Sequence, residues 1–146
     1  MRFYPRLLVA PFLSGITSSD RRLAIKKLLP VDNDPRASYL LTAEVGEVTR
    51  LNHPNIIRIL GLSNDQENNV CLIYPYMSHG NMEEALESQI LAPRLTFETR
   101  LQILIGVAEA VKFLHVRPKA LLHRDIKTPN ILLDDNMQPK VSERGG

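Results

Sequence analysis

The chain has 146 residues, of which 44% are hydrophobic and 23% are charged, so its composition is that of a folded domain and not of a disordered segment. Eighteen Lys and Arg against 16 Asp and Glu leave a net charge of +2, which gives no electrostatic basis for binding nucleic acid or an anionic membrane. The single cysteine, Cys71, excludes an internal disulfide framework and a cysteine-rich zinc site, and favours a reducing, intracellular setting.

The first apolar stretch, residues 7–13, is interrupted by Pro11 and is far too short to span a bilayer. Arg2 and Arg6 precede it, as in a signal peptide, but no clear small-residue cleavage site follows. We therefore expect an edge or frayed segment of the fold rather than a targeting sequence. Residues 1–13 are treated as an atypical N-terminal segment.

The following stretches predict strands with one helix. A strand is expected over residues 23–29, ended by Pro30, and a helix over residues 38–51 with a serine at its N-terminus. Apolar strands are expected over residues 56–62 and 70–77, with a polar turn between them.

The second half predicts helices and then short hairpin-like strands. After a turn at residues 78–81 we expect a short helix over residues 82–89 and a long helix over residues 96–115. The apolar face of the long helix is predicted to comprise Leu101, Leu104, Ile105, Ala108, Val111 and Leu114. The strand-like pieces are residues 120–122, 131–133 and 140–141. The composition changes near the turn, which predicts an α+β fold with a lobe boundary there.

The most informative segment is the polar stretch of residues 123–130, which lies between apolar residues on both sides. Apolar flanks hold both ends of a short loop in a core, so the loop can present a carboxylate, an amine and an amide from a rigid base. A carboxylate can orient a hydroxyl and accept its proton, an amine can stabilise a transferring phosphoryl group, and an amide oxygen can ligate a metal. The plainer alternative is a polar turn with a capping aspartate.

This segment, His-Arg-Asp-Ile-Lys-x-x-Asn, resembles the catalytic loop of eukaryotic protein kinases of the serine/threonine type. The resemblance implies that Asp125 is the catalytic base, that Lys127 lies near the transferring phosphate, and that Asn130 holds a Mg²⁺ ion. It also implies an α+β, bilobal kinase fold that is incomplete. Residues 14–77 would form a partial N-lobe that lacks its first strands, and residues 78–146 would form the start of a helical C-lobe.

Residues 23–26, Leu-Ala-Ile-Lys, are similar to the Val-Ala-Ile-Lys strand of the same family. Side chains alternate along a strand, so Ala24 and Lys26 share one face, and the resemblance implies that this face meets the nucleotide, with Lys26 on its phosphates. Glu44 lies at the centre of the apolar stripe of the predicted helix, where a carboxylate needs a cation, and Lys26 is the candidate. Alternatively the helix is rotated, and Glu44 faces solvent beside Glu47.

Residues 72–77 resemble the hinge between the kinase lobes, where the family binds adenine through backbone groups. Pro75 stands where many relatives have Glu, and it keeps the carbonyl acceptor while lacking the N–H. The N–H two residues further on belongs to Met77, so the substitution is compatible with ATP binding. Residues 77–86, 95–115 and 131–139 resemble plant receptor-like kinases.

Two features depart from the family pattern. Only one glycine, Gly15, precedes Lys26, so the Gly-rich loop that covers the phosphates is missing. Glu143 and Arg144 stand where the family has Asp and Phe. The longer Glu143 side chain moves its oxygens relative to Mg²⁺, and Arg144 puts a charge in place of a packed ring. With no activation loop before the last residue, we expect a truncated kinase.

Two functions from different classes therefore stay open, besides that of an incomplete gene product. One is ATP- and Mg²⁺-dependent phosphoryl transfer to Ser or Thr of a protein substrate, and the other is a catalytically impaired, pseudokinase-like binding module. We expect a protein substrate or signalling partner, no nucleic acid and no transmembrane segment. The resemblance implies a cytoplasmic location, at the inner face of the plasma membrane if the chain is part of a receptor-like kinase. The apolar face of the long helix is expected to be exposed and prone to aggregation.

Overall fold

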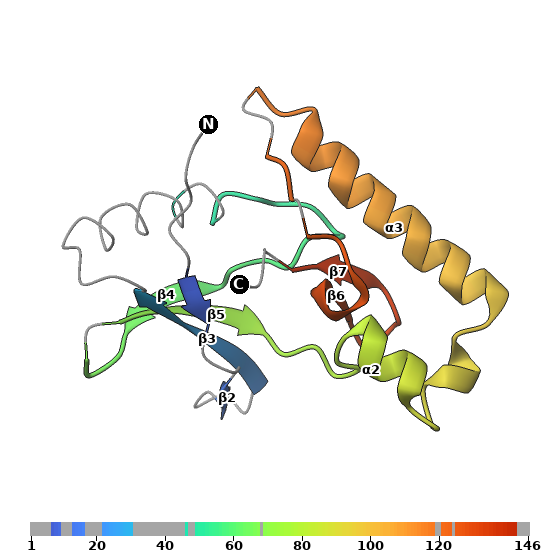
Figure 1. The fold of residues 1–146 in the computed structure, drawn as a ribbon, viewed down its shortest axis with the longest axis horizontal. Helices are drawn as coiled ribbons and strands as arrows, with labels where there is room; N and C mark the ends of the chain where they lie inside the picture. The colour runs from blue at the N-terminus through green and yellow to red at the C-terminus, as the bar shows by residue number, and fades with distance from the viewer. Residues whose placement is uncertain are drawn as a thin grey trace. The chain divides into compact units, whose positions relative to one another are not determined.

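The computed structural model describes residues 7–9, 13–16, 22–30, 46, 49–67, 69–118, 121–123 and 125–142. The chain divides into two compact units. Among the described residues, those before Asn52 together with Arg58–Tyr76 form the first unit, and Asn52–Ile57 together with the residues from Met77 onward form the second. The strands of the first unit and the helices of the second can be followed in Figure 1.

The first unit is an antiparallel sheet. Its strands are β1 (Leu7–Val9), β2 (Leu13–Ile16), β3 (Arg22–Pro30), β4 (Gly61–Asn64) and β5 (Val70–Pro75). The order is β1-β3-β5-β4, and β2 also pairs with β3. Lys26 lies opposite Leu72 on β5, and Lys27 lies opposite Cys71. Both Lys26 and Leu72 are buried, so this face of β3 contributes to the core.

The strand predicted over residues 23–29 is confirmed as β3. The expectation that the sheet lacks earlier strands is wrong, because β1 and β2 both precede β3 and pair with it. The physical reason is the length of β3. The last three residues of β3 pair with β1 and its first four pair with β2, so β3 is long enough to pair with both strands. As expected of an edge segment, β1 lies at one edge of the sheet.

The helix predicted over residues 38–51 lies mostly outside the described residues. Gly46 is helical, whereas Thr49 and Arg50 form a turn. The hydroxyl of Thr49 donates a hydrogen bond to the carbonyl of Gly46 at 3.1 Å. The helix therefore ends before Thr49, and the predicted end at Leu51 is wrong.

The strand predicted over residues 56–62 is also wrong in its position, because β4 begins only at Gly61. Ile56 and Ile57 are adjacent and both buried, so the alternation of a half-buried strand fails there, although burial alternates from Ile57 to Leu60. The N–H of Ile57 donates to the carbonyl of Val141 within the second unit, at 3.0 Å. This segment supplies buried isoleucines to both units, which explains why an apolar run here is not one strand.

The second unit combines helices with a small hairpin. Its elements are α2 (Met82–Glu87), η1 (Ala92–Arg94), α3 (Phe97–His115), η2 (Thr128–Asn130), β6 (Ile131–Leu133) and β7 (Pro139–Val141). The Asn81 side chain caps α2 and the Thr96 side chain caps α3. These helices and the β6–β7 hairpin confirm the predicted elements. Leu121 and Leu122 form no strand, because the N–H of Leu121 instead donates to Leu114 at the end of α3.

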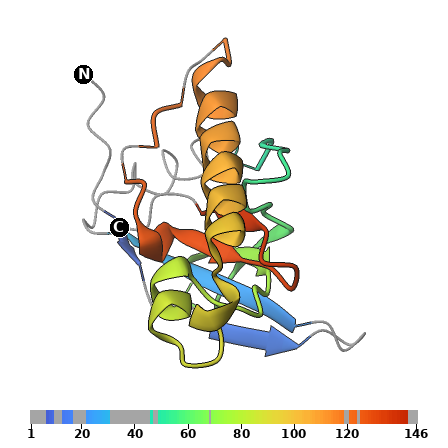
Figure 2. The same cartoon turned by 90° about the vertical axis from the view of Figure 1, so that its right-hand side faces the viewer.

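Helix α3 packs through a face that shares only Leu114 with the apolar face predicted to be exposed. Its buried residues are Ile103, Gly106, Val107, Ala110 and Leu114. Leu101, Leu104 and Ile105 are exposed, so the expected open apolar patch is present. Gly106 accounts for the choice of face, because a Cβ there would lie 2.6 Å from Cγ of Pro139. Figure 2 shows α3 beside the β6–β7 hairpin, in the close approach that this glycine permits.

The short segment Asn52–Ile57 is bound to β7 by several hydrogen bonds within the second unit. The Asn55 side chain donates to the carbonyl of Pro139 at 3.1 Å, and the N–H of Val141 donates to the carbonyl of Asn55 at 2.8 Å. The ammonium of Lys140 donates to the carbonyl of Pro54 at 2.6 Å. Residues far apart in sequence therefore fix the hairpin that carries the polar loop.

Candidate functional site

The structure brings Asp125, Lys127 and Asn130 together in one cluster. Nζ of Lys127 lies 3.0 Å from Oδ2 of Asp125. The Asn130 side chain amide donates to the carbonyl oxygen of Asp125 at 2.8 Å and to its Oδ2 at 2.9 Å. Asn130 is 7% exposed, whereas the Lys127 side chain is 53% exposed. The cluster thus has a buried amide on one side of Asp125 and a solvent-accessible cation on the other.

The loop is held at both ends by Ser142, which follows β7. Nε2 of His123 donates to the carbonyl of Ser142 at 2.6 Å, and Nδ1 of His123 accepts the N–H of Asp125 at 3.3 Å. A carbonyl only accepts, so the hydrogen must be on Nε2 and Nδ1 is left as the acceptor. The N–H of Ser142 donates to the carbonyl of Asn130 at 2.9 Å. The hairpin and the histidine together fix where Asp125 lies.

The pKa of Asp125 is lowered from its ordinary value. The hydrogen bond from Lys127 is the main cause, and the hydrogen bond from Asn130 and the charge of Lys127 act in the same direction. Partial burial opposes these effects. The carboxyl group is therefore ionised at neutral pH, and it can accept a hydrogen bond from a hydroxyl group.

Asn130 has the chemistry of one Mg²⁺ ligand. The hydrogen bonds from its side chain to Asp125 use Nδ2, and an amide oxygen is a ligand that Mg²⁺ accepts. Within the described ranges, no group of three or more His, Cys, Asp or Glu side chains could hold a metal ion. Mg²⁺ usually takes one or two protein ligands and completes its shell with water and phosphate oxygens, so Asn130 fits such a site. The other predicted ligand, Glu143, lies outside the described residues.

The remaining predicted site residues fall in both units. Ala24 lies opposite Tyr74, and Pro75 lies opposite Leu23 at the end of β5, all in the first unit with Lys26. Met77 begins the next stretch of the second unit, where its carbonyl accepts the N–H of Gly80 at 3.2 Å. Glu44 lies outside the described residues, so its predicted pairing with Lys26 stays a prediction.

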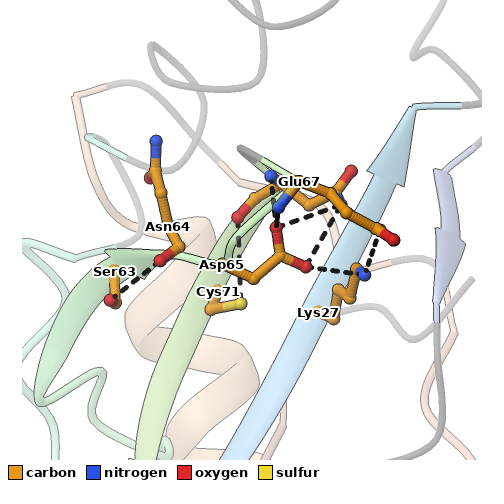
Figure 3. Close-up of polar contacts among 7 residues, drawn as sticks. Lys27, Ser63, Asn64, Asp65, Glu67 and Cys71 are labelled. Atoms are coloured by element: carbon orange, nitrogen blue, oxygen red, sulfur yellow. Dashed lines mark hydrogen bonds and ion pairs between the residues drawn. The ribbon is translucent and has the colours of Figure 1, made fainter.

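A second polar cluster, around Lys27 in the first unit, was not predicted from the sequence. Figure 3 shows the Lys27 ammonium between Asp65 and Glu67, at 2.6 Å from Oδ2 of Asp65 and 2.9 Å from Oε2 of Glu67. The pattern Asp65-x-Glu67-x-Asn69 between two strands could have indicated it, since an Asp at the start of a turn commonly accepts backbone N–H groups.

Comparisons with known proteins agree with this geometry. A family model described as protein tyrosine and serine/threonine kinase matches residues 12–145. The fold is that of part of a kinase domain. A solved structure of an apo pseudokinase aligns with a TM-score of 0.76 at 19% identity, over 90% of this chain and 49% of that one. The chain belongs to the protein tyrosine and serine/threonine kinase family.

Among curated proteins, the chain is similar to plant receptor-like kinases. It is 38% identical to the receptor-like protein kinase ANXUR2 and 35% identical to ANXUR1, both of Arabidopsis thaliana, over 132 residues. It is 39% identical over 103 residues to interleukin-1 receptor-associated kinase 1 of Bos taurus. The alignments with the two plant proteins cover 90% of this chain. The chain spans only about 15% of the length of each of the three relatives. No helix in the part of the chain that the structure describes is long and apolar enough to cross a membrane.

Proposed function

We propose that the chain is part of a serine/threonine protein kinase and takes part in transferring the γ-phosphoryl group of ATP to a hydroxyl of a protein substrate. The observation that carries this proposal is the cluster of Asp125, Lys127 and Asn130, held by Ser142 and buried on the Asn130 side. The family uses ATP and Mg²⁺ for this reaction.

In this proposal Asp125 orients the substrate hydroxyl and accepts its proton. The lowered pKa supports this role, because the carboxylate is ionised and ready to accept a hydrogen bond. Lys127 is half exposed, so its ammonium can turn from Asp125 to a phosphate oxygen at little cost. When bound, ATP would supply the transferred phosphoryl group and Mg²⁺ would offset part of its negative charge. Asn130 and Glu143 are the proposed metal ligands.

The first unit is proposed to bind the nucleotide. Lys26 would contact the phosphates and pair with Glu44, Ala24 would line the adenine pocket, and the Pro75 carbonyl with the Met77 N–H would bind the adenine edge. Residues 14–77 and 78–146 would then be parts of the two kinase lobes. A protein substrate and a cytoplasmic location, at the inner membrane face in a receptor-like kinase, follow from the same proposal.

A second candidate is a catalytically impaired binding module. Two observations favour it. No Gly-rich loop precedes Lys26, and Glu143-Arg144-Gly145 stands where the family has Asp-Phe-Gly. A carboxylate displaced by one methylene can weaken Mg²⁺ binding, since that ion requires near-ideal octahedral geometry.

One experiment separates the two candidates. Thermal unfolding is measured with and without Mg²⁺-ATP, and phosphate transfer to a generic protein substrate is followed in parallel. The kinase proposal predicts an ATP-induced stabilisation that Lys26→Met removes, and a transfer that Asp125→Asn abolishes while stabilisation by ATP persists. Stabilisation without any transfer supports a binding module that holds nucleotide. No stabilisation in the wild type contradicts the kinase proposal and leaves a module that only binds a partner.

A further inference from the structure

Lys27 is next to the proposed nucleotide lysine but lies on the opposite face of β3. Its cross-strand neighbour is Cys71, whereas that of Lys26 is Leu72. The Lys27 side chain is 22% exposed and its ammonium contacts Asp65, which is 25% exposed, and Glu67, which is 75% exposed. The two neighbouring lysines are therefore in different environments: Lys26 is buried, whereas Lys27 is part-exposed and its ammonium contacts two carboxylates.

The turn between β4 and β5 orients the Asp65 carboxylate through backbone hydrogen bonds that do not involve Lys27. Oδ1 of Asp65 accepts the N–H of Glu67 at 2.9 Å and the N–H of Asn69 at 2.8 Å. The N–H of Asp65 donates back to the carbonyl of Asn69 at 3.0 Å, which closes the turn. The other oxygen, Oδ2, faces Lys27 (Figure 3). The carboxylate is thus a fixed anchor on the β4–β5 turn.

This anchor constrains β3 at the residue that follows Lys26. Side chains alternate along a strand, and a slip of one residue moves every side chain to the other face. While the Lys27 ammonium is bound at the turn, Lys26 must point to the face that it shares with Leu28 and Leu72, both of which are buried. A rotation that exposed Lys26 would break the contacts of Lys27 with Asp65 and Glu67.

We propose that Lys27 is a positioning residue: anchored to Asp65, it keeps β3 in the register and twist that hold Lys26 on the buried face of the sheet. The link to catalysis rests on the proposed role of Lys26 in binding the phosphates of ATP. Asp65 is the main partner, because Glu67 is largely exposed and exposed pairs contribute little. The two carboxylates raise the pKa of Lys27 to about 12, so its ammonium stays charged at every physiological pH.

The test compares Lys27→Met with Lys27→Arg in the full chain. Both variants remove the neighbouring lysine amine, so acylation at this position of β3 reports on Lys26 alone. The rate of its acylation by an amine-reactive reagent is followed by mass spectrometry. We expect Lys27→Met to accelerate labelling of Lys26 about two- to fivefold, the range that a part-exposed ion pair can account for. Lys27→Arg should restore the slow rate, since a guanidinium can bind the same carboxylates.

Two further variants complete the design. Asp65→Asn keeps a hydrogen-bond acceptor for the turn but loses the negative charge, so it should also accelerate Lys26 labelling. This variant tests the proposal if Lys27→Met does not fold. Lys112→Met, at an exposed position of α3, should leave the rate unchanged. The proposal is overturned if folded Lys27→Met and Asp65→Asn both label Lys26 at the wild-type rate. Because labelling needs no ATP, accelerated labelling in a chain that does not bind Mg²⁺-ATP would support the positioning role while contradicting the kinase function.

Discussion

Asn130 holds Asp125 at two points, with hydrogen bonds from one side chain amide to both the backbone carbonyl and the carboxylate of the aspartate. Asn130 is buried, whereas Lys127, the other partner of the carboxylate, is half exposed. The position of Asp125 therefore depends on the amide, and its electrostatics depend mainly on the lysine.

Asn130→Ala should destabilise the protein by about 1–3 kcal/mol, because the carbonyl of Asp125 loses its donor in a partly buried site. Urea denaturation followed by circular dichroism measures the change. Asn136→Ala, at an exposed position of the β6–β7 turn, is the control and should change stability far less. Equal losses in the two variants would argue against a special role for the buried amide.

Lys127→Met should raise the pKa of Asp125 toward its ordinary value, since the hydrogen bond from Lys127 is the largest cause of the lowering. A carboxyl with a lowered pKa contributes stability above the pKa of the unfolded chain and loses it as the pH falls through the folded value. The variant should therefore lose less stability on acidification than the wild type. Carbon NMR titration of the carboxyl group measures the pKa, and Lys112→Met should leave it unchanged.

Gly106→Ala should destabilise the protein by about 1–3 kcal/mol through overpacking. An added Cβ would meet Cγ of Pro139 at 2.6 Å and Nδ2 of Asn55 at 2.7 Å. Gly46→Ala is the matched control, because Gly46 is also helical and a Cβ there meets nothing within 4 Å. It should instead stabilise the helix by about 0.5–1 kcal/mol. Thermal or urea unfolding of the two variants should give changes of opposite sign.

The ion pair of Lys27 with Asp65 should give a defined pH dependence of stability. The pKa of Asp65 lies well below its ordinary value of 3.8, mainly because of Lys27, so its contribution is present above that value and is lost as the pH falls. The pKa of Lys27 is raised from 10.5 to about 12, so its contribution is present below 10.5 and is lost as the pH rises through 12.

The difference in unfolding free energy between the wild type and Lys27→Met should therefore be constant near neutrality and should shrink as the pH is lowered from about 5 to about 3. Denaturant titrations at several pH values measure it. Lys112→Met should give no such trend, and a difference that persists undiminished in acid would show that Lys27 acts through packing of its stem rather than through its charge.

Local patterns predicted most elements of the fold. Residues 23–29 are a mostly apolar run bounded by Pro30, and residues 96–115 combine a threonine cap with helical spacing, so β3 and α3 could be located from the sequence. The face of α3 that is buried could not be predicted from the sequence. Apolar residues lie on both sides of this helix, and the choice is made by Gly106, whose lack of a side chain admits Pro139 from a distant hairpin.

The catalytic-loop cluster was predicted because its residues are close in sequence, and the structure brings Asp125, Lys127 and Asn130 together. The roles assigned to them stay predictions. The contacts of Lys27 could not be predicted in the same way, because they join residues about 40 positions apart. The strand predicted over residues 56–62 failed for a related reason, since Ile57 and Ile59 are buried in different units.

The segment Asn52–Ile57 has a consequence for how the chain could be divided. It belongs to the second unit, yet the first unit precedes it and follows it in sequence, so the chain passes between the units at Leu51, at Ile57 and at Tyr76.

A protease that cut only between Tyr76 and Met77 would leave Asn55 and Ile57 attached to one fragment and their partners Pro139 and Val141 on the other. The two fragments should therefore stay together on a sizing column under native conditions and separate only in denaturant. Either fragment expressed alone should lack part of its fold until the other is added.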